Sequence, residues 1–467
     1  MEEKVKLSSR LWLGSADCMI TTLCNIMTGG GLTFFFVNYF KMDEGLSALC
    51  WLIFGIWNAI NDPLFGFISD RTNSKIGRRI PYIRYGSIAI AAIFVLSWVL
   101  WFGNGSDGQL FAQMLISLFL FDTLYTAIAT SLYVMPFEMA VTNKARGKIL
   151  FVKVIFGLVA LAVPLFLLAE LQNILNHSLK TYQLIMTGIG VLAGIIVFVS
   201  TFFYKENGYV KQEQQPPFFK SLKICFKNKS FIVFEIISFS ITYIQTALMM
   251  GLSYYFDAFK INYLWCYLAL FIGIAFGMFM YSKFQCKWGV KKSVVIMCVI
   301  FGSGTLFLML LGQYLFAGII GFLCAGIGFT GGMYMIPLMN GDVIDYDEHI
   351  NGLRREGMYA GVNSFICKPS ISIANALFPV MLLWFGYNKD VSMFEQTELA
   401  KLGIKISWLL IPAVLLLICA LSIKLFYPLY GEKWNEIKAN LAIKHERKQK
   451  EYELEMLDKN SDQNKWI

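Results

Sequence analysis

Residues 57–81 read WNAINDPLFGFISDRTNSKIGRRIP, which begins as an apolar helix and ends as a basic loop. Asn58 and Asp62 are four residues apart, so on a helix they share one face and converge on one small ligand. The ring of Pro63 excludes the usual hydrogen bond to the carbonyl of Ala59, so we expect a bend and a free backbone oxygen beside the carboxylate. The segment therefore predicts a cation site within a membrane.

An alternative is that Asp62 is only a polar group in helix packing, or that it lies close to the membrane surface. Carboxylates inside a membrane are costly, and they commonly mark ion or proton pathways. We therefore favour the cation site.

The composition indicates a membrane protein with many spans. The chain has 467 residues, of which 57% are hydrophobic and 15% charged, and its mean hydropathy is +0.58. Soluble domains carry about 25% charged residues. The net charge is +9, but the basic residues lie in short loops between apolar stretches. They are typical of orientation signals and not of a nucleic-acid groove, so we predict no nucleic-acid partner.

Windows of about 20 apolar residues predict twelve transmembrane helices. We expect them near residues 11–40, 46–70, 80–102, 108–138, 148–170, 181–204, 230–257, 262–282, 292–312, 315–340, 356–386 and 404–428. An even number of spans places both termini on one side. The lysines and arginines concentrate at the N-terminus, in alternate loops and in the tail, so the positive-inside rule makes both termini cytoplasmic.

A weak internal repeat divides the chain into two halves. Four residues of the first half recur at one constant offset in the second, counting Lys and Arg as equivalent. These are Arg71, Lys75, Gly77 and Arg79, which recur as Lys283, Lys287, Gly289 and Lys291. Both sets fall in the expected loop between the second and third spans of a half. Such repeats are typical of transporters that bind substrate between two bundles.

The fold class that we predict is therefore an all-α membrane protein with two pseudo-symmetric six-helix bundles. The bundles cover residues 1–204 and 230–428, and a polar cytoplasmic linker at 205–229 joins them. The tail, 429–467, is either an amphipathic helix on the membrane surface or partly disordered.

Metal centres and enzyme motifs are not indicated. Most of the ten cysteines lie in apolar runs without CxxC spacing, and the three histidines are far apart. The chain shows no paired catalytic acids, no Ser/His arrangement and no phosphate-binding glycine loop. We therefore expect neither a cofactor nor a metal beyond a sodium site, and a membrane-embedded enzyme is the disfavoured alternative class.

Two long motifs carry a resemblance to a known family. The run NDPLFGFISDRTNSKIGRRIPY at 61–82 and the run DVIDYDEHINGLRREGMYAGVNSFICK at 342–368 resemble signatures of the glycoside-pentoside-hexuronide:cation symporters. These belong to the major facilitator superfamily and include the melibiose permease. The resemblance covers essentially the whole chain, and it implies the major facilitator fold and cation-coupled sugar symport.

The resemblance also implies a sodium site. Carried over by position, its residues are Asn58, Asn61, Asp62 and Thr126. The first of these is a carboxylate in the family and an amide here. An amide oxygen still coordinates a cation, but the site has one negative charge fewer. A single carboxylate inside the membrane also binds a proton, so the coupling ion is either Na⁺ or H⁺.

The sugar site departs further from the family. Its two acids align, if no gap intervenes, with Thr21 and Ala129, so we expect neither carboxylate to be kept. The remaining predicted substrate residues are Tyr133, Lys153, Asn363, Ser364 and Lys368. Each of the two lysines either faces the cavity or extends to the membrane surface. Melibiose itself is therefore not expected as substrate.

Charged residues at the cytoplasmic helix ends predict a gate. The set comprises Asp70, Arg71, Arg78, Arg79, Glu138, Arg146, Asp342, Asp345, Arg354, Arg355 and Glu356. A metal site in the acidic segment 342–349 is the less favoured alternative. We expect exposed ion pairs, each worth about 0–1 kcal/mol.

The sequence therefore predicts a secondary active transporter in the cell membrane that couples a sugar or glycoside-like solute to a cation. A lysophospholipid or another amphiphile is the alternative substrate. We expect a monomer whose partners are its small-molecule substrate and membrane lipid.

Overall fold

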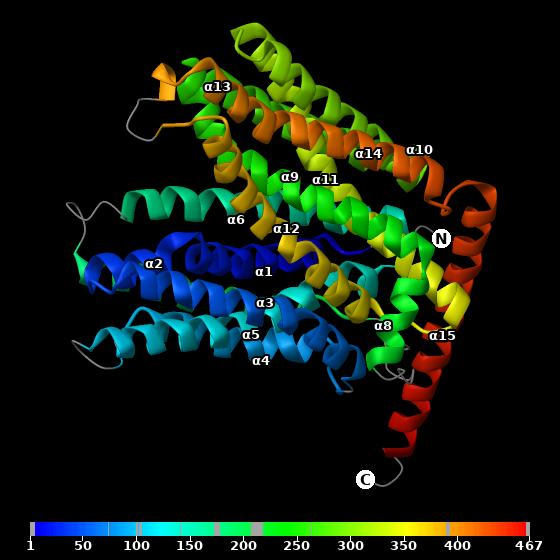
Figure 1. Cartoon of the computed structure of the whole chain (residues 1–467). Coiled ribbons are helices and arrows are strands. Elements are labelled where there is room, and N and C mark those ends of the chain that lie inside the picture. The colour runs from blue at the N-terminus through cyan, green and yellow to red at the C-terminus, as the bar shows by residue number, and fades with distance from the viewer. Residues whose placement is uncertain are drawn as a thin grey trace. The chain divides into compact units, whose positions relative to one another are not determined.

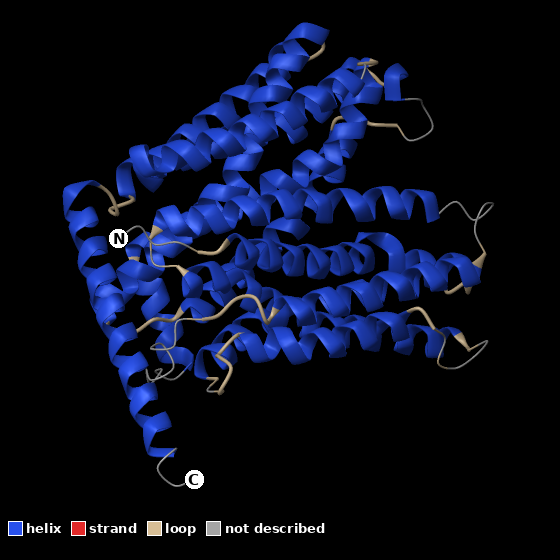
Figure 2. Cartoon of the chain, turned by 180° about the vertical axis from the view of Figure 1, so that it is seen from behind, coloured by secondary structure: helices blue, strands red, loops and turns tan. Residues whose placement is uncertain are grey.

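The computed structural model describes residues 5–72, 74–99, 101, 105–140, 142–171, 178–206, 218–261, 263–388 and 393–463. Every regular element within these ranges is a helix (Figure 2). The chain separates into two compact units. Unit 1 comprises residues 1–218, 353–362 and 440–467, and unit 2 comprises residues 219–352 and 363–439.

Unit 1 is a bundle of long apolar helices (Figure 1). The elements are α1 (Leu7–Ile26), the π-turn η1 (Met27–Gly31), α2 (Leu32–Phe34), the π-turn η2 (Phe35–Tyr39), α3 (Glu44–Arg71), α4 (Ile80–Ser97), α5 (Asp107–Met139), α6 (Asn143–Leu171) and α7 (Leu179–Ser200). Helix α1 packs against α6 and α7, and α5 packs against both α3 and α4. This arrangement brings the polar residues of α3 and α5 together.

Unit 2 is built around α10 and α11, and α10 comprises two helical segments that meet at Gly289 and both pack against α11. Its elements are α8 (Phe218–Lys227), α9 (Lys229–Phe259), α10 (Tyr263–Leu311), α11 (Leu315–Asn351), η4 (Met393–Glu395), α13 (Glu398–Lys405), η5 (Ile406–Leu410) and α14 (Ile411–Phe426). Helices α12 (Glu356–Trp384) and α15 (Gly431–Gln463) contribute residues to both units. The predicted tail is thus helical from Gly431 to Gln463.

The helix pattern confirms the predicted all-α class. Nine of the described helices are long and apolar enough to cross a membrane. One of them, α10, contains two of the expected spans. The two expected spans that the sequence separated at 283–291 are two helical segments that meet at Gly289, the residue of α10 with non-helical backbone angles, so the connection is shorter than the expected loop.

The two repeat glycines share an unusual backbone conformation. Gly77 has φ +132° and Gly289 has φ +73°. An L side chain is strained at such angles, so glycine is favoured at both places. The conformation gives a structural reason for the glycine in the repeat.

A close helix crossing brings the two signature motifs together within unit 1. Gly357 and Gly361 form a G-x-x-x-G pair at the start of α12, a spacing that lets helix backbones approach closely. A Cβ atom at Gly66 of α3 would collide with the Gly357 carbonyl oxygen, and one at Gly361 would lie 2.7 Å from the carbonyl oxygen of Asp62. The crossing therefore places the backbone of α12 against the backbone of α3 at Asp62, the predicted cation-binding residue.

Candidate functional site

The predicted cation residues lie on the α3–α5 contact. The Thr126 hydroxyl donates to Asp62 Oδ1 at 2.9 Å, and both side chains are buried. Asn61 Nδ2 donates to the carboxylate of Asp122 at 3.0 Å and to its backbone carbonyl at 3.2 Å. Asn58 is half-buried on α3, and α3 continues through Pro63 to Arg71.

Asp122 is a second carboxylate that the sequence analysis missed. Its exposed fraction is 5%, against 4% for Asp62. The sequence could have predicted this residue, because Asp122 lies inside the span at 108–138, one helical turn before Thr126. The expectation of a single carboxylate near this site is therefore wrong.

The orientation of the Asn61 amide follows from its hydrogen bonds. Because its nitrogen donates twice to Asp122, its carbonyl oxygen points away from that residue and is available to accept or to coordinate. The group thus presents carboxylate, amide and hydroxyl oxygens, which are the ligand types that hard cations prefer.

Lys153 is held inside unit 1 by an acid and a carbonyl. Its ammonium lies 3.1 Å from Asp17 Oδ1 and donates to the Leu132 carbonyl oxygen at 2.9 Å. Pro136 lies four residues after Leu132 within α5 and has no N–H to occupy that carbonyl. Of the two positions left open for Lys153, the interior of the bundle is the one observed.

Asp17 is an acid of α1 that the sequence analysis did not consider. The aligned position, Thr21, is half-buried one turn further along α1. Asp17 pairs with Lys153 of α6. The expectation that Thr21 and Ala129 replace the two sugar-site acids of the family stays a prediction.

The other predicted substrate residues divide between the units. Tyr133 is half-buried in unit 1, with its ring edge-on to Phe137. In unit 2, Asn363, Ser364 and Lys368 are half-buried on α12, and the Cys367 thiol donates to Asn363 Oδ1 at 3.3 Å.

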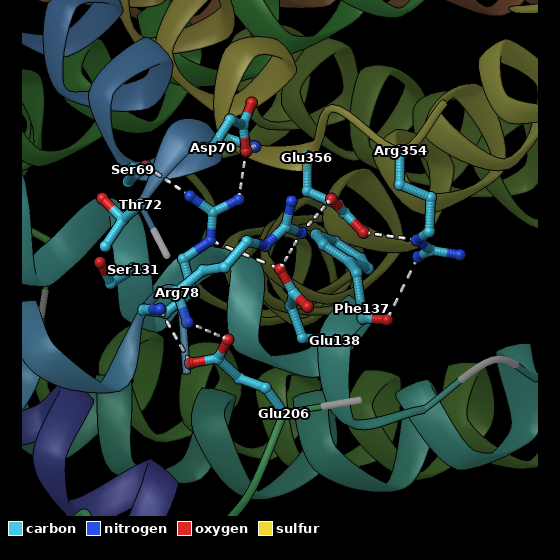
Figure 3. A network of polar contacts seen from close by, with 12 residues as sticks. Ser69, Asp70, Thr72, Arg78, Ser131, Phe137, Glu138, Glu206, Arg354 and Glu356 are labelled. Carbon is cyan, nitrogen blue, oxygen red and sulfur yellow. Dashed lines mark hydrogen bonds and ion pairs between the residues drawn. The ribbon is translucent and has the colours of Figure 1, made fainter. Parts of the chain in front are cut away.

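A buried ion-pair cluster joins the loop before α4 to the ends of α5 and α12 (Figure 3). Arg78 Nη2 lies 2.7 Å from Glu138 and 3.2 Å from Glu356. The other oxygen of Glu356 lies 2.5 Å from Arg354 Nε. Arg79 pairs with Asp70 and lies 3.4 Å from Glu138.

Two carboxylates of this region cap helices. Asp70 accepts from the backbone N–H groups of Gly357 and Met358 at 2.9 and 2.7 Å, at the N-terminus of α12. Glu206 accepts from the N–H groups of Arg78, Arg79 and Ile80 at 2.7–2.8 Å, at the N-terminus of α4 (Figure 3). Negative charge is favourable at both places, because helix N-termini carry unpaired donors and partial positive charge.

The expectation of exposed, weak ion pairs is wrong for this cluster. Its arginines and glutamates are at most 2% exposed, and buried pairs are far more costly to break than exposed ones. Burial lowers the pKa of the Arg78 and Arg79 guanidinium groups, but the surrounding carboxylates outweigh it and raise both pKa values. Both arginines therefore stay charged at physiological pH.

The remaining predicted gate residues lie around this cluster or in unit 2. Arg71 is exposed, with its guanidinium over the Phe67 ring. Arg146 donates to the Ala140 carbonyl at 3.0 Å, and Arg355 is buried.

In unit 2, the predicted gate residues are Asp342 and Asp345. Asp342 pairs with Lys438 at 2.5 Å, and Asp345 is buried. Burial and then the charges of these two acids raise the pKa of Tyr427.

A model of the family described as MFS/sugar transport protein matches residues 15–431. The match covers most of the chain, so the chain belongs to this family, and the resemblance to the glycoside-pentoside-hexuronide:cation symporters is confirmed.

Relatives of known name cover nearly the same length. The chain is 24% identical over 455 residues to the uncharacterized symporter YnaJ of Bacillus subtilis, covering 94% of this chain and 95% of that protein. It is 25% identical over 422 residues to the isoprimeverose transporter of Lactiplantibacillus pentosus, covering 85% and 83%.

The fold also matches a solved transporter. The Escherichia coli fucose:proton symporter superposes with a TM-score of 0.59 at 14% identity, over 89% of this chain and 98% of that one. This likeness confirms the major facilitator fold.

Proposed function

We propose that this protein is a secondary active transporter that couples uptake of a sugar or glycoside-like solute to movement of a cation. Family membership supports the assignment as a transporter. We propose that the coupling cation binds beside the buried Asp62–Thr126 and Asn61–Asp122 hydrogen bonds. Two carboxylates on adjoining helices repel each other in a low-dielectric interior, so a bound cation or proton stabilises the pair.

The oxygen ligands of this site suit Na⁺ as well as H⁺. Asp62, Asn61, Asn58, Asp122 and Thr126 are the proposed ligands. The second carboxylate compensates for the amide at position 58 and restores the charge that the family's sodium site carries.

The Asp17–Lys153 pair is the proposed solute anchor. A carboxylate accepts from sugar hydroxyls and an ammonium donates to them, and such charge-assisted hydrogen bonds are roughly twice as strong as neutral ones. Tyr133 in unit 1, and Asn363, Ser364 and Lys368 in unit 2, are the other residues that we propose to contact the solute.

Alternating access requires a closure that forms in one state and opens in the other. We assign the cytoplasmic closure to the cluster of Arg78, Arg79, Glu138, Arg354 and Glu356. We further propose that two six-helix bundles, at 1–204 and 230–428, form the transporter, and that both termini are cytoplasmic. The protein is proposed to act as a monomer in the cell membrane and to catalyse no reaction.

Gradient-driven uptake tests this function. Purified protein in liposomes is given an inward Na⁺ gradient or an inward proton gradient, and uptake of labelled glycosides, pentosides, uronides and lysophospholipids is measured. Accumulation of a sugar above equilibrium, abolished by an ionophore for one of the two ions, is expected. Equilibration at the same rate with and without either gradient, or chemical turnover of the substrate, would contradict the proposal.

A further inference from the structure

Helix α9 carries a row of polar side chains that the proposed transport mechanism does not use. Glu235, Ser238, Thr242 and Gln245 follow one another at intervals of three or four residues, so they share one face of the helix. All four lie within the candidate membrane span Lys229–Leu248. Burying polar side chains inside a membrane span costs free energy, and such residues commonly mark a functional site.

Both ends of this row hold unpaired buried atoms. Glu235 is 6% exposed, and neither of its carboxylate oxygens has a hydrogen-bond partner among the described residues. The same holds for Nε2 of Gln245. Native proteins satisfy nearly all buried polar groups, so an unpaired carboxylate needs a physical explanation.

The middle of the row is connected to α12. Ser238 lies one turn after Glu235, and its hydroxyl accepts from the Cys367 thiol at 3.2 Å. The same thiol lies 3.3 Å from Asn363 Oδ1, the alternative acceptor of its one S–H, and the Thr242 hydroxyl donates to the Ser238 carbonyl at 2.8 Å. The row therefore runs from Glu235 to the α12 residues proposed to bind solute.

The surroundings of Glu235 disfavour a negative charge. The Cys367 thiol of α12 is a titratable group that lies near the Glu235 carboxylate. The Cys419 thiol of α14 contacts Ser240, which lies on α9 as Glu235 does. Among the described residues, no ion pair and no hydrogen bond involves the carboxylate of Glu235. An ionised carboxylate without a counter-charge or donors is strongly disfavoured in an apolar interior, whereas the neutral acid is tolerated.

We propose that Glu235 is a proton-binding site in unit 2, separate from the cation group of α3 and α5. One carboxylate oxygen forms an O–H bond with a proton taken from water, and the side-chain charge changes from −1 to 0. On release the proton returns to water. This assignment rests on burial and missing partners, and it holds for any solute that the protein carries.

Infrared spectroscopy tests the proposal directly. Wild-type protein and Glu235→Gln are compared at neutral pH in H₂O and D₂O, with Glu398→Gln as the control, because the Glu398 side chain is exposed. The wild type is expected to show the carbonyl stretch of a protonated carboxyl that is absent from Glu235→Gln and unchanged in the control. A difference spectrum showing an ionised carboxylate at Glu235 would overturn the proposal.

A second readout counts protons. Unfolding in weakly buffered solution at neutral pH exposes Glu235 to water, where it ionises, so the wild type is expected to release one proton more than Glu235→Gln. Equal release would overturn the proposal. If Glu235→Gln does not fold, Glu235→Asp replaces it in the infrared comparison, because a shorter acid in the same environment must keep a protonated band at a shifted position. Its appearance as a carboxylate would likewise overturn the proposal.

Discussion

Replacing Glu356 with Gln removes the carboxylate that joins two buried guanidinium groups. Its oxygens lie 2.5 Å from Arg354 Nε and 3.2 Å from Arg78 Nη2, and all three side chains are almost fully buried. Breaking a buried ion pair costs about 3–5 kcal/mol, because a charge is left without compensation. We therefore expect the free energy of unfolding to fall by this amount, a factor of roughly 10² to 4 × 10³ in the folding equilibrium.

The measurement is denaturant-induced unfolding of the purified protein in detergent micelles, followed by helical circular dichroism. Glu398→Gln is the matched control, because Glu398 is 88% exposed and pairs with Lys401 at 3.1 Å. An exposed pair contributes about 0–1 kcal/mol. If Glu356→Gln and Glu398→Gln both lie within about 1 kcal/mol of the wild type, the cluster does not stabilise this state and the reasoning is refuted.

Three further predictions concern other parts of unit 1. Gly66→Ala is expected to destabilise the protein by about 1–3 kcal/mol, because the new Cβ atom collides with the Gly357 carbonyl. Gly55 has open space around it, so Gly55→Ala should stabilise α3 by up to about 1 kcal/mol. Unfolding curves that rank the two variants in the opposite order would contradict the close crossing of α3 and α12. Lys153→Ala is expected to weaken solute binding by about 1.5–3 kcal/mol in calorimetry, and unaltered affinity in both this variant and Asp17→Asn would move the solute site elsewhere. Asn58→Asp is expected to raise the apparent Na⁺ affinity of transport by adding a charged oxygen near Asp62, and an unchanged Na⁺ dependence would argue against a shared site.

The sequence was sufficient for the fold class, because apolar windows of bilayer length are typical of helices that cross a membrane. It did not predict how short the connection at 283–291 is. The residues on both sides of Gly289 are helical, and only Gly289 departs from helical geometry. Polar residues at a membrane surface are compatible with a helix or a loop, so composition alone does not determine the length of the connection.

Of the residues predicted for the cation site, Asp62 and Thr126 are hydrogen-bonded in the structure. Asp122 and Asp17 were missed because they do not lie at the positions that the family resemblance assigns to the site. Glu206 lies in the polar linker, where a charged residue is expected to be solvated. Its capping of α4 depends on a tertiary contact that local sequence does not encode.

The burial of the gate charges was also unpredictable from sequence. Arg78 and Glu356 are separated by most of the chain, and each lies in a polar segment that resembles a solvated loop. Their burial follows from the glycine crossing of α3 and α12, which brings the start of α12 against the loop before α4.

The most direct test of cation-coupled transport is the comparison of accumulation and exchange in Asp62→Asn. Asn keeps the size of the side chain and its bond from Thr126, but it removes the charge that we propose binds the cation. In liposomes under the gradient that drives the wild type, we predict that the variant does not accumulate solute above equilibrium, while it still exchanges labelled for unlabelled solute. Accumulation at the wild-type level would contradict the account, because the cation would then bind without Asp62.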